Sequence, residues 1–122
     1  MLVTCTEDGK VRIWSVEGEL IHELNKHTEE INAVQWSRNN RYIVSADADG
    51  TAIVWNSQDG TVKQEFKFHT KIVWNVDWQN DEVFATCSRD GTIQVCKIGQ
   101  NKPVKVTLLC VIDVIRHFNK RF

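Results

Sequence analysis

The chain repeats itself, and this repetition limits the folds that are open to it. Three segments align without gaps, and they are residues 2–14, 43–55 and 84–96. Their shared Asp-Gly pairs begin at Asp8, Asp49 and Asp90, which are 41 residues apart. A second block, residues 27–36, recurs at residues 69–78. A fixed period of this length is typical of stacked repeats, in which each unit covers the apolar face of the next.

Each repeat is predicted to contain about four short antiparallel strands. The Asp-Gly pair is a strong hairpin signal, since a type I′ turn needs positive φ at its central residues. After the first pair, Val11 and Ile13 face one way and Arg12 the other, which is the period of a strand. Further turn sequences at residues 37–40 and 59–60 divide the second repeat. No window before the C-terminal tail has helical periodicity.

Composition excludes several classes of function. The chain has 122 residues, with 15 Lys and Arg against 16 Asp and Glu. This near-neutral balance argues against a nucleic-acid binder that works through bulk charge. The start of the chain does not resemble a signal peptide, and the longest apolar stretch is too short for a membrane span. The four cysteines lack metal-site spacing and the glycines form no phosphate loop, so we expect no metal and no cofactor.

A period of about 40–45 residues, with four strands, an early His and a late Trp, resembles the WD40 repeat. The resemblance covers residues 1 to about 105. It implies an all-β fold: a WD40 β-propeller fragment of about two to three four-stranded antiparallel blades, without closure. The predicted units are a partial blade at 1–25, blades at 26–67 and 68–105, and a non-matching tail at 106–122. The third repeat departs from the pattern, because Cys96 replaces its Trp.

Several stretches resemble one WD40 subfamily more closely. They are residues 63–69, 76–79, 84–88 and above all 93–105, where Cys96 is followed by Lys-Ile-Gly-Gln. These stretches are similar to the transducin-beta-like WD-repeat subunits of nuclear receptor corepressor (N-CoR/SMRT) complexes. The resemblance implies a nuclear, non-enzymatic scaffold whose partners are corepressor subunits, histone deacetylase and histone tails. The alternatives are another WD40 scaffold, in signalling or as a ubiquitin-ligase adaptor, or a truncated product with no function of its own.

One set of polar residues suggests two chemistries. His27, Ser45 and Asp49 have the residue types of a hydrolase triad. The set recurs one period later, however, which favours a structural device that every blade needs. In WD40 proteins these positions form a buried hydrogen-bond chain with the Trp, here expected from Trp55 to Ser45, His27 and Asp49. The resemblance assigns this structural role to Thr4, Asp8, Trp14, His27, Ser45, Asp49, Trp55, His69, Thr86 and Asp90.

A second set is a candidate binding surface. Trp74 stands where the previous repeat has Asn32, and the resemblance places this position on the narrow rim where ligands bind. The residue before the turn Asp, which is Glu7 in the first repeat and Arg89 in the third, faces the same rim. A rim Trp near an Arg would suit a peptide-binding hot spot. The alternative is that Trp74 packs against a neighbouring blade.

The tail at 106–122 matches no WD40 repeat. It either completes the last blade as a strand followed by a short amphipathic helix, or belongs to a truncated or misjoined gene product, and we favour the second interpretation. Terminal blades of a partial propeller expose apolar faces and strand edges. We therefore expect marginal stability or self-association through exposed blade edges.

Overall fold

The structure, a computed structural model, describes residues 1–108 as eleven β-strands in three antiparallel sheets. The first sheet holds β1 (Leu2–Cys5), β2 (Lys10–Trp14) and β3 (Leu20–Asn25). The second holds β4 (Ile31–Trp36), β5 (Tyr42–Asp47), β6 (Ala52–Asn56) and β7 (Val62–Phe66). The third holds β8 (Val73–Trp78), β9 (Val83–Ser88), β10 (Thr92–Lys97) and β11 (Lys105–Leu108). Within this described part, no helix is long and apolar enough to span a membrane.

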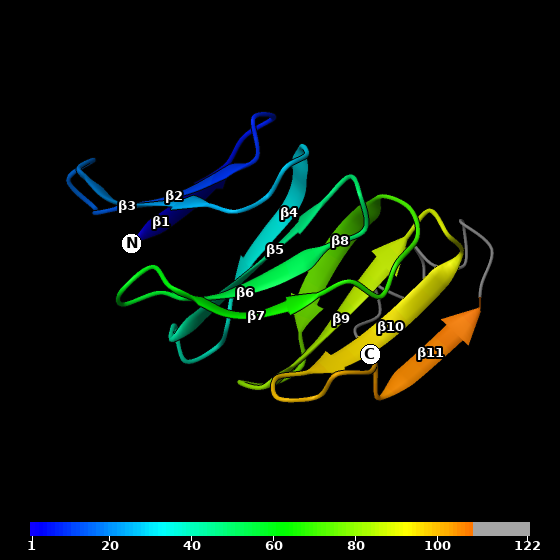
Figure 1. The fold of residues 1–122 in the computed structure, drawn as a ribbon. Coiled ribbons are helices and arrows are strands. Elements are labelled where there is room, and N and C mark those ends of the chain that lie inside the picture. Colours follow the sequence, from blue (N-terminus) through cyan, green and yellow to red (C-terminus); the bar gives the residue numbers. More distant parts are fainter. Residues whose placement is uncertain (109–122) are drawn as a thin grey trace.

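Figure 1 shows the three sheets following one another in chain order, as open blades that do not close into a ring. We call them blades 1, 2 and 3. The all-β prediction is confirmed by this arrangement. The strand β11 pairs with β10 from Lys105 to Leu108, so the first residues of the non-matching tail complete blade 3 as a strand. The proposed helix in that tail falls in residues 109–122, which lie outside the described residues.

The middle blade is apolar on both faces, because its alternating residues pack against two neighbours. Ile43, Ile53 and Trp55 join Val11 and Ile13 of blade 1 in one buried layer. The intervening residues of β5 and β6 join blade 3 in a second layer, which contains Val44, Ala46, Ala52, Val54, Phe66, Val73, Val76, Trp78, Phe84 and Cys96. The burial of such layers is the main source of stability in stacked repeats.

The Asp-Gly hairpins occur where predicted, but their turns are not of type I′. The glycines have positive φ, at 82° for Gly9, 96° for Gly50 and 87° for Gly91. The preceding aspartates do not, since Asn40 is the one non-glycine residue with positive φ in the described part. Each glycine N–H instead donates to the carbonyl three residues earlier. The hairpin is therefore a longer loop with a single left-handed residue.

Candidate functional site

A buried hydrogen-bond relay crosses blade 2. The indole N–H of Trp55 donates to Ser45 Oγ at 2.8 Å, and Ser45 Oγ lies 2.5 Å from His27 Nε2. His27 Nδ1 lies 2.6 Å from Asp47 Oδ2. A carboxylate only accepts, so Nδ1 carries the proton, and Nε2 accepts from the Ser45 hydroxyl. Every link is satisfied with a neutral imidazole.

The acidic end of this relay is Asp47, and the prediction of Asp49 is wrong. Asp47 ends β5 and pairs with Ile31 at the start of β4, which places its carboxylate beside the loop that carries His27. Asp49 lies exposed on the turn, where its carboxylate accepts from the backbone N–H and the hydroxyl of Thr51. The sequence has two carboxyl groups two residues apart here, and the strand pairing brings the first of them, which was not predicted, to the histidine.

The two carboxyl groups also differ in their pKa values. Burial alone would raise the pKa of Asp47, but hydrogen bonds from His27, Asp49 and Thr51 outweigh it and lower the pKa. The neighbouring Asp47 carboxyl and partial burial raise the pKa of Asp49. Asp47 is therefore the anionic end of the relay over the neutral pH range.

Blade 3 has a shorter relay. His69 Nε2 lies 2.6 Å from Thr86 Oγ1, and His69 Nδ1 lies 2.8 Å from Asp90 Oδ2. Here the turn aspartate is the partner, because Ser88 occupies the position that Asp47 has in blade 2. The indole link is missing, since Cys96 stands at the Trp position. Separately from this relay, the buried Gln94 amide donates to the Phe68 carbonyl at 2.9 Å.

Burial has opposite effects on the two ends of this relay. It lowers the pKa of His69, although the hydrogen bond and the charge of Asp90 oppose the shift. It would raise the pKa of Asp90, but the hydrogen bonds from Thr92 and His69 outweigh it and lower the pKa. A neutral imidazole beside a carboxylate is the form that both directions favour.

Blade 1 contains half of a relay. The Trp14 indole donates to Thr4 Oγ1 at 2.9 Å, which matches the corresponding link in blade 2. Asp8 is exposed on the turn, and the Thr6 hydroxyl donates to its carboxylate. That hydrogen bond lowers the pKa of Asp8. No histidine of the described residues joins Thr4 to Asp8.

The predicted rim residues have mixed environments. Trp74 is half-buried at a register shift in β8 and packs against a small cluster of Ala85, Cys87 and Ile93. Asn32 occupies the corresponding register shift in β4. Its Nδ2 is buried and has no hydrogen-bond partner within residues 1–108. β-Bulges re-aim the side chain of the extra residue, which explains why the alternation does not place these residues.

The two turn residues of the predicted rim are solvent-exposed. Glu7 lies in the turn between β1 and β2, and Arg89 lies in the turn between β9 and β10. The backbone N–H of Arg89 donates to the Ile72 carbonyl at 3.0 Å, so this turn lies against the segment that leads into β8. The half-buried Trp74 comes two residues after Ile72 in the chain.

The buried polar groups are poorly placed for nucleophilic chemistry. Ser45 is 0% exposed, and its hydroxyl is engaged by both Trp55 and His27. Burial raises the pKa of the Cys87 thiol to about 11 and that of Cys96 to about 12, which keeps both protonated. Among residues 1–108, no group of His, Cys, Asp and Glu could hold a metal ion.

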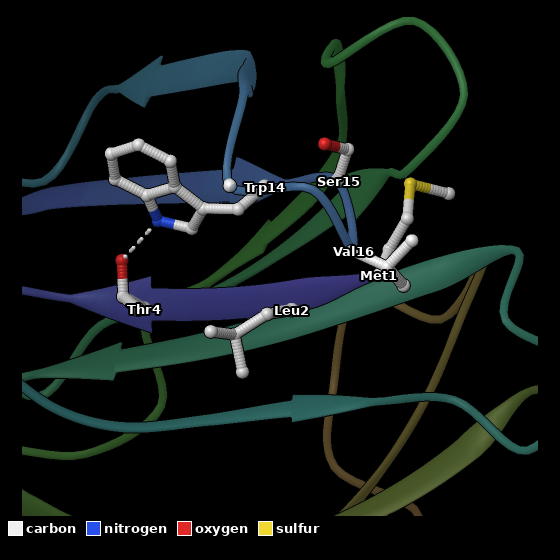
Figure 2. Close-up of a pocket in the computed structure, with 7 residues that line it drawn as sticks. Met1, Leu2, Thr4, Trp14, Ser15 and Val16 are labelled. Carbon is white, nitrogen blue, oxygen red and sulfur yellow. Dashed lines mark hydrogen bonds between the residues drawn. The ribbon is translucent and has the colours of Figure 1, made fainter.

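An open pocket lies on blade 1, a terminal blade, where an exposed apolar face but no particular pocket was predicted. It has a volume of about 510 Å³ and is lined by Met1, Leu2, Thr4, Trp14, Ser15, Val16 and Gly18. Figure 2 shows the hydrogen-bonded Trp14 and Thr4 side chains in this lining, near Leu2. The repeat alignment could have indicated this pocket. Leu2 and Trp14 correspond to Ile43 and Trp55 of blade 2, which blade 1 covers.

The blades, the relays and the comparisons define one class of protein. The family model for the WD domain, G-beta repeat, matches residues 1–15, 18–56 and 60–97, and the chain belongs to this family. The crystal structure of the C-terminal WD40 domain of Sif2 superposes with a TM-score of 0.77 and 33% identity. That match covers 85% of this chain and 30% of the Sif2 chain. The predicted β-propeller architecture is thereby confirmed, in a family of generally non-catalytic scaffolds.

Among individual proteins, the chain is similar to the human F-box-like/WD repeat-containing protein TBL1X. The two are 44% identical over 105 residues, which are 86% of this chain and 18% of TBL1X. The WD40 repeat-containing protein HOS15 of Arabidopsis thaliana is 41% identical over 105 residues, or 86% of this chain and 17% of HOS15. The chain thus spans less than a fifth of the length of these relatives. The predicted resemblance to the transducin-beta-like proteins is confirmed.

Proposed function

We propose that this chain is part of a non-enzymatic, nuclear protein-interaction scaffold of a transcriptional corepressor and histone deacetylase complex. The observation that carries the proposal is the 44% identity to TBL1X, which extends over 86% of the chain. It also extends through the stretch at residues 93–105 that resembles the transducin-beta-like subfamily. The proposed partners are corepressor subunits, histone deacetylase and histone tails, with no direct binding of nucleic acid or membrane.

The geometry supports a platform of rigid blades that carries exposed turns. The relays of blades 2 and 3 tie each His loop to its own sheet through buried hydrogen bonds. Exposed turn residues such as Glu7 and Arg89 then project from fixed positions. Turns whose backbone is already held lose less conformational entropy on binding than free loops do, so such turns suit protein recognition.

The proposal is tested by capture from nuclear extract. The tagged full chain is compared with the double variant Trp74→Ala, Arg89→Ala and with a matched surface variant, Lys63→Ala, on the exposed outer strand β7. Corepressor subunits and histone deacetylase are expected with the wild type and Lys63→Ala chains, and in smaller amount with the double variant. Far-ultraviolet circular dichroism checks that all three chains are folded.

Recovery of a different set of proteins would favour another WD40 scaffold. Recovery of no partner by a chain that is folded would refute the proposal. Equal recovery by the double variant would refute only the assignment of Trp74 and Arg89 to the binding surface. Expression as a fluorescent fusion tests the proposed nuclear location separately.

A further inference from the structure

A polar pocket lies on blade 2, at the end opposite to the predicted rim. It has a volume of about 360 Å³ and is formed by the β4–β5 turn and the β6–β7 turn (Figure 1). The rim turn that holds Ala48 instead joins β5 to β6. Blade 2 packs against a neighbouring blade on each side, so this pocket does not belong to an uncovered terminal face. The residues that line it are Asn39, Asn40, Arg41, Asn56, Ser57 and Gln58.

Several main-chain acceptors of this lining are already engaged. The Ser57 hydroxyl donates to the Asn40 carbonyl at 2.7 Å and also lies 3.0 Å from the Arg41 carbonyl. The Ser57 N–H donates to the same Arg41 carbonyl at 3.0 Å. The Gln58 carbonyl accepts from His22 Nε2 at 2.9 Å. These internal hydrogen bonds hold the two turns together and leave their carbonyls satisfied without a ligand.

Two asparagine side chains of the lining have free donor ends. Asn39 Oδ1 accepts from the Ser37 hydroxyl at 2.8 Å and from the Arg41 N–H at 3.0 Å. Asn56 Oδ1 accepts from the Gln58 N–H at 3.2 Å. A backbone N–H needs an acceptor, so these bonds fix which end of each amide is the oxygen. In the described part of the chain no hydrogen bond uses Nδ2 of either asparagine, so each has two free N–H donors.

Arg41 adds a positive charge whose position is restrained. Its guanidinium carbon lies 5.8 Å from the centre of the Tyr42 ring, which is a cation–π contact. Arg41 forms no ion pair with any of the described residues. The planar guanidinium suits bidentate recognition of a carboxylate or a phosphate group. A positive charge beside free amide donors therefore favours an anionic ligand with more than one acceptor oxygen.

The surroundings favour a carboxylate over a phosphate group. Arg41 is the one cationic side chain of the lining, and two acidic residues lie next to the lining residues. Asp81 accepts from the Asn39 N–H at 3.0 Å, and Asp59 follows Gln58 directly in the chain. A phosphate group carries about two negative charges near neutral pH. It would therefore meet more repulsion from these aspartates than a singly charged carboxylate does.

The pocket is open, which favours one side chain of a longer chain over a small free acid. Of the lining residues, Ser57 is buried and Asn56 is half-buried, and the other four are exposed. Sites for small molecules usually enclose most of their ligand. A peptide can instead place one side chain in such a pocket and make further contacts with the exposed turns around it.

The side chains of this pocket are not a feature of every repeat. The backbone contact recurs in blade 3, where the Ile98 N–H donates to the Glu82 carbonyl at 2.9 Å, as the Ser57 N–H does to Arg41. The charge does not recur, because Glu82 stands at the repeat position of Arg41. A device that stabilises each blade would recur, as the relays do. The polar side chains of blade 2 are therefore not needed for the turn itself.

We propose that this pocket binds a carboxylate side chain in an acidic segment of a partner protein. The Arg41 guanidinium pairs with the carboxylate, and the Nδ2 groups of Asn39 and Asn56 donate to its oxygens. The acidic segment thereby docks at the end of blade 2 that lies opposite to the rim. This site uses blade 2 alone and does not depend on the corepressor proposal.

The test is an NMR titration of the full, isotope-labelled chain with a synthetic hexaglutamate peptide. The side-chain amide signals of Asn39 and Asn56 and the Nε–H signal of Arg41 are expected to shift until the site is saturated. A hexaglutamine peptide has the same length but no carboxylate, and it is expected to cause no such shift. Free glutarate and inorganic phosphate represent the small acid and the phosphate group, and both are expected to bind more weakly than hexaglutamate.

Three variants of the protein test the named residues. Arg41→Gln is expected to weaken binding of hexaglutamate about fivefold, as the loss of a solvent-exposed ion pair predicts. Arg38→Gln is the matched control and is expected to bind normally, because Arg38 is an exposed arginine of the same turn that does not line the pocket. Asn56→Asp retains an oxygen that can accept from the Gln58 N–H but replaces the free amide donor by a negative charge, so it is expected to abolish binding. The amide signals outside the two turns show whether each variant is folded.

Four results would overturn the proposal. The first is a folded chain whose pocket signals do not shift with hexaglutamate, and the second is an equal shift with hexaglutamine. The third is tighter binding of glutarate or phosphate than of hexaglutamate, which would contradict an acidic peptide as the ligand. The fourth is an equal loss of binding in Arg41→Gln and Arg38→Gln, or undiminished binding by folded Asn56→Asp, because general charge attraction and not this pocket would then hold the peptide.

Discussion

Replacement of Asp47 by Ala is expected to destabilise the chain far more than replacement of Asp49. The Asp47 side chain is 2% exposed and accepts from His27 Nδ1 at 2.6 Å and from the backbone N–H groups of Asp49 and Thr51 at 3.0 Å. Loss of a hydrogen bond to a buried charged group costs about 1.5–3 kcal/mol, and an unpaired backbone N–H adds about 1 kcal/mol. Thr51 keeps a second acceptor in Asp49, so we expect a total loss of about 3 kcal/mol.

The Asp49→Ala variant is the control, because it removes a carboxylate from the same turn. Asp49 is exposed, and its removal also relieves repulsion from Asp47, so its expected cost is less than about 1 kcal/mol. Urea unfolding followed by tryptophan fluorescence measures both free energies. The difference of about 2 kcal/mol corresponds to a shift of about 1–2 M in the urea midpoint. An equal or larger loss for Asp49→Ala would refute the assignment of Asp47 to the relay.

Three further predictions concern packing and pH. Gly50→Ala is expected to cost several-fold more stability than Gly18→Ala in the same urea assay. Both glycines have positive φ, but a Cβ at Gly50 would collide with the His69 carbonyl, whereas a Cβ at Gly18 would meet open space. Trp78→Ala is expected to cost about 3–5 kcal/mol and Trp74→Ala clearly less, because Trp78 is 3% exposed and Trp74 is half-buried; equal losses would contradict this environment for Trp74. Burial lowers the pKa of His69 below its ordinary 6.5. The contribution of His69 to stability is therefore complete above pH 6.5 and is lost as the pH falls below that value. The thermal midpoint of the wild-type chain is expected to fall over this acidic range, and that of His69→Gln is expected to fall less.

The repeated parts of the fold were predictable from the sequence. The period of 41 residues and the Asp-Gly pairs locate three hairpins, and the structure has a strand on each side of every pair. The alternation of apolar and polar residues predicts these strands, because it depends only on the local sequence. The type of turn was not predictable in the same way, since it depends on backbone hydrogen bonds such as the one from Gly9 N–H to the Thr6 carbonyl.

The acidic end of the relay was predictable only in part. Repeat alignment placed Asp49 beside Asp90, and the same alignment places Asp47 beside Ser88. The prediction assumed that equivalent positions have equivalent roles. In the structure a carboxylate that ends β5 reaches His27 first, and the turn aspartate serves only where that position is not acidic. The signal was present as a second aspartate in one repeat, but choosing between the two required the β4–β5 register.

The relay histidines also connect neighbouring blades, which the repeat pattern alone does not show. A Cβ on Gly9 of blade 1 would lie 2.8 Å from the His27 carbonyl, and a Cβ on Gly50 of blade 2 would meet the His69 carbonyl. Each histidine therefore uses its side chain within its own blade and its backbone against the hairpin turn of the preceding blade. Glycine suits that turn for two reasons, because the backbone there has positive φ and because no side chain fits against the carbonyl. Beside the buried apolar layers, nearest-neighbour coupling in this stack thus includes one residue that belongs to both contacts.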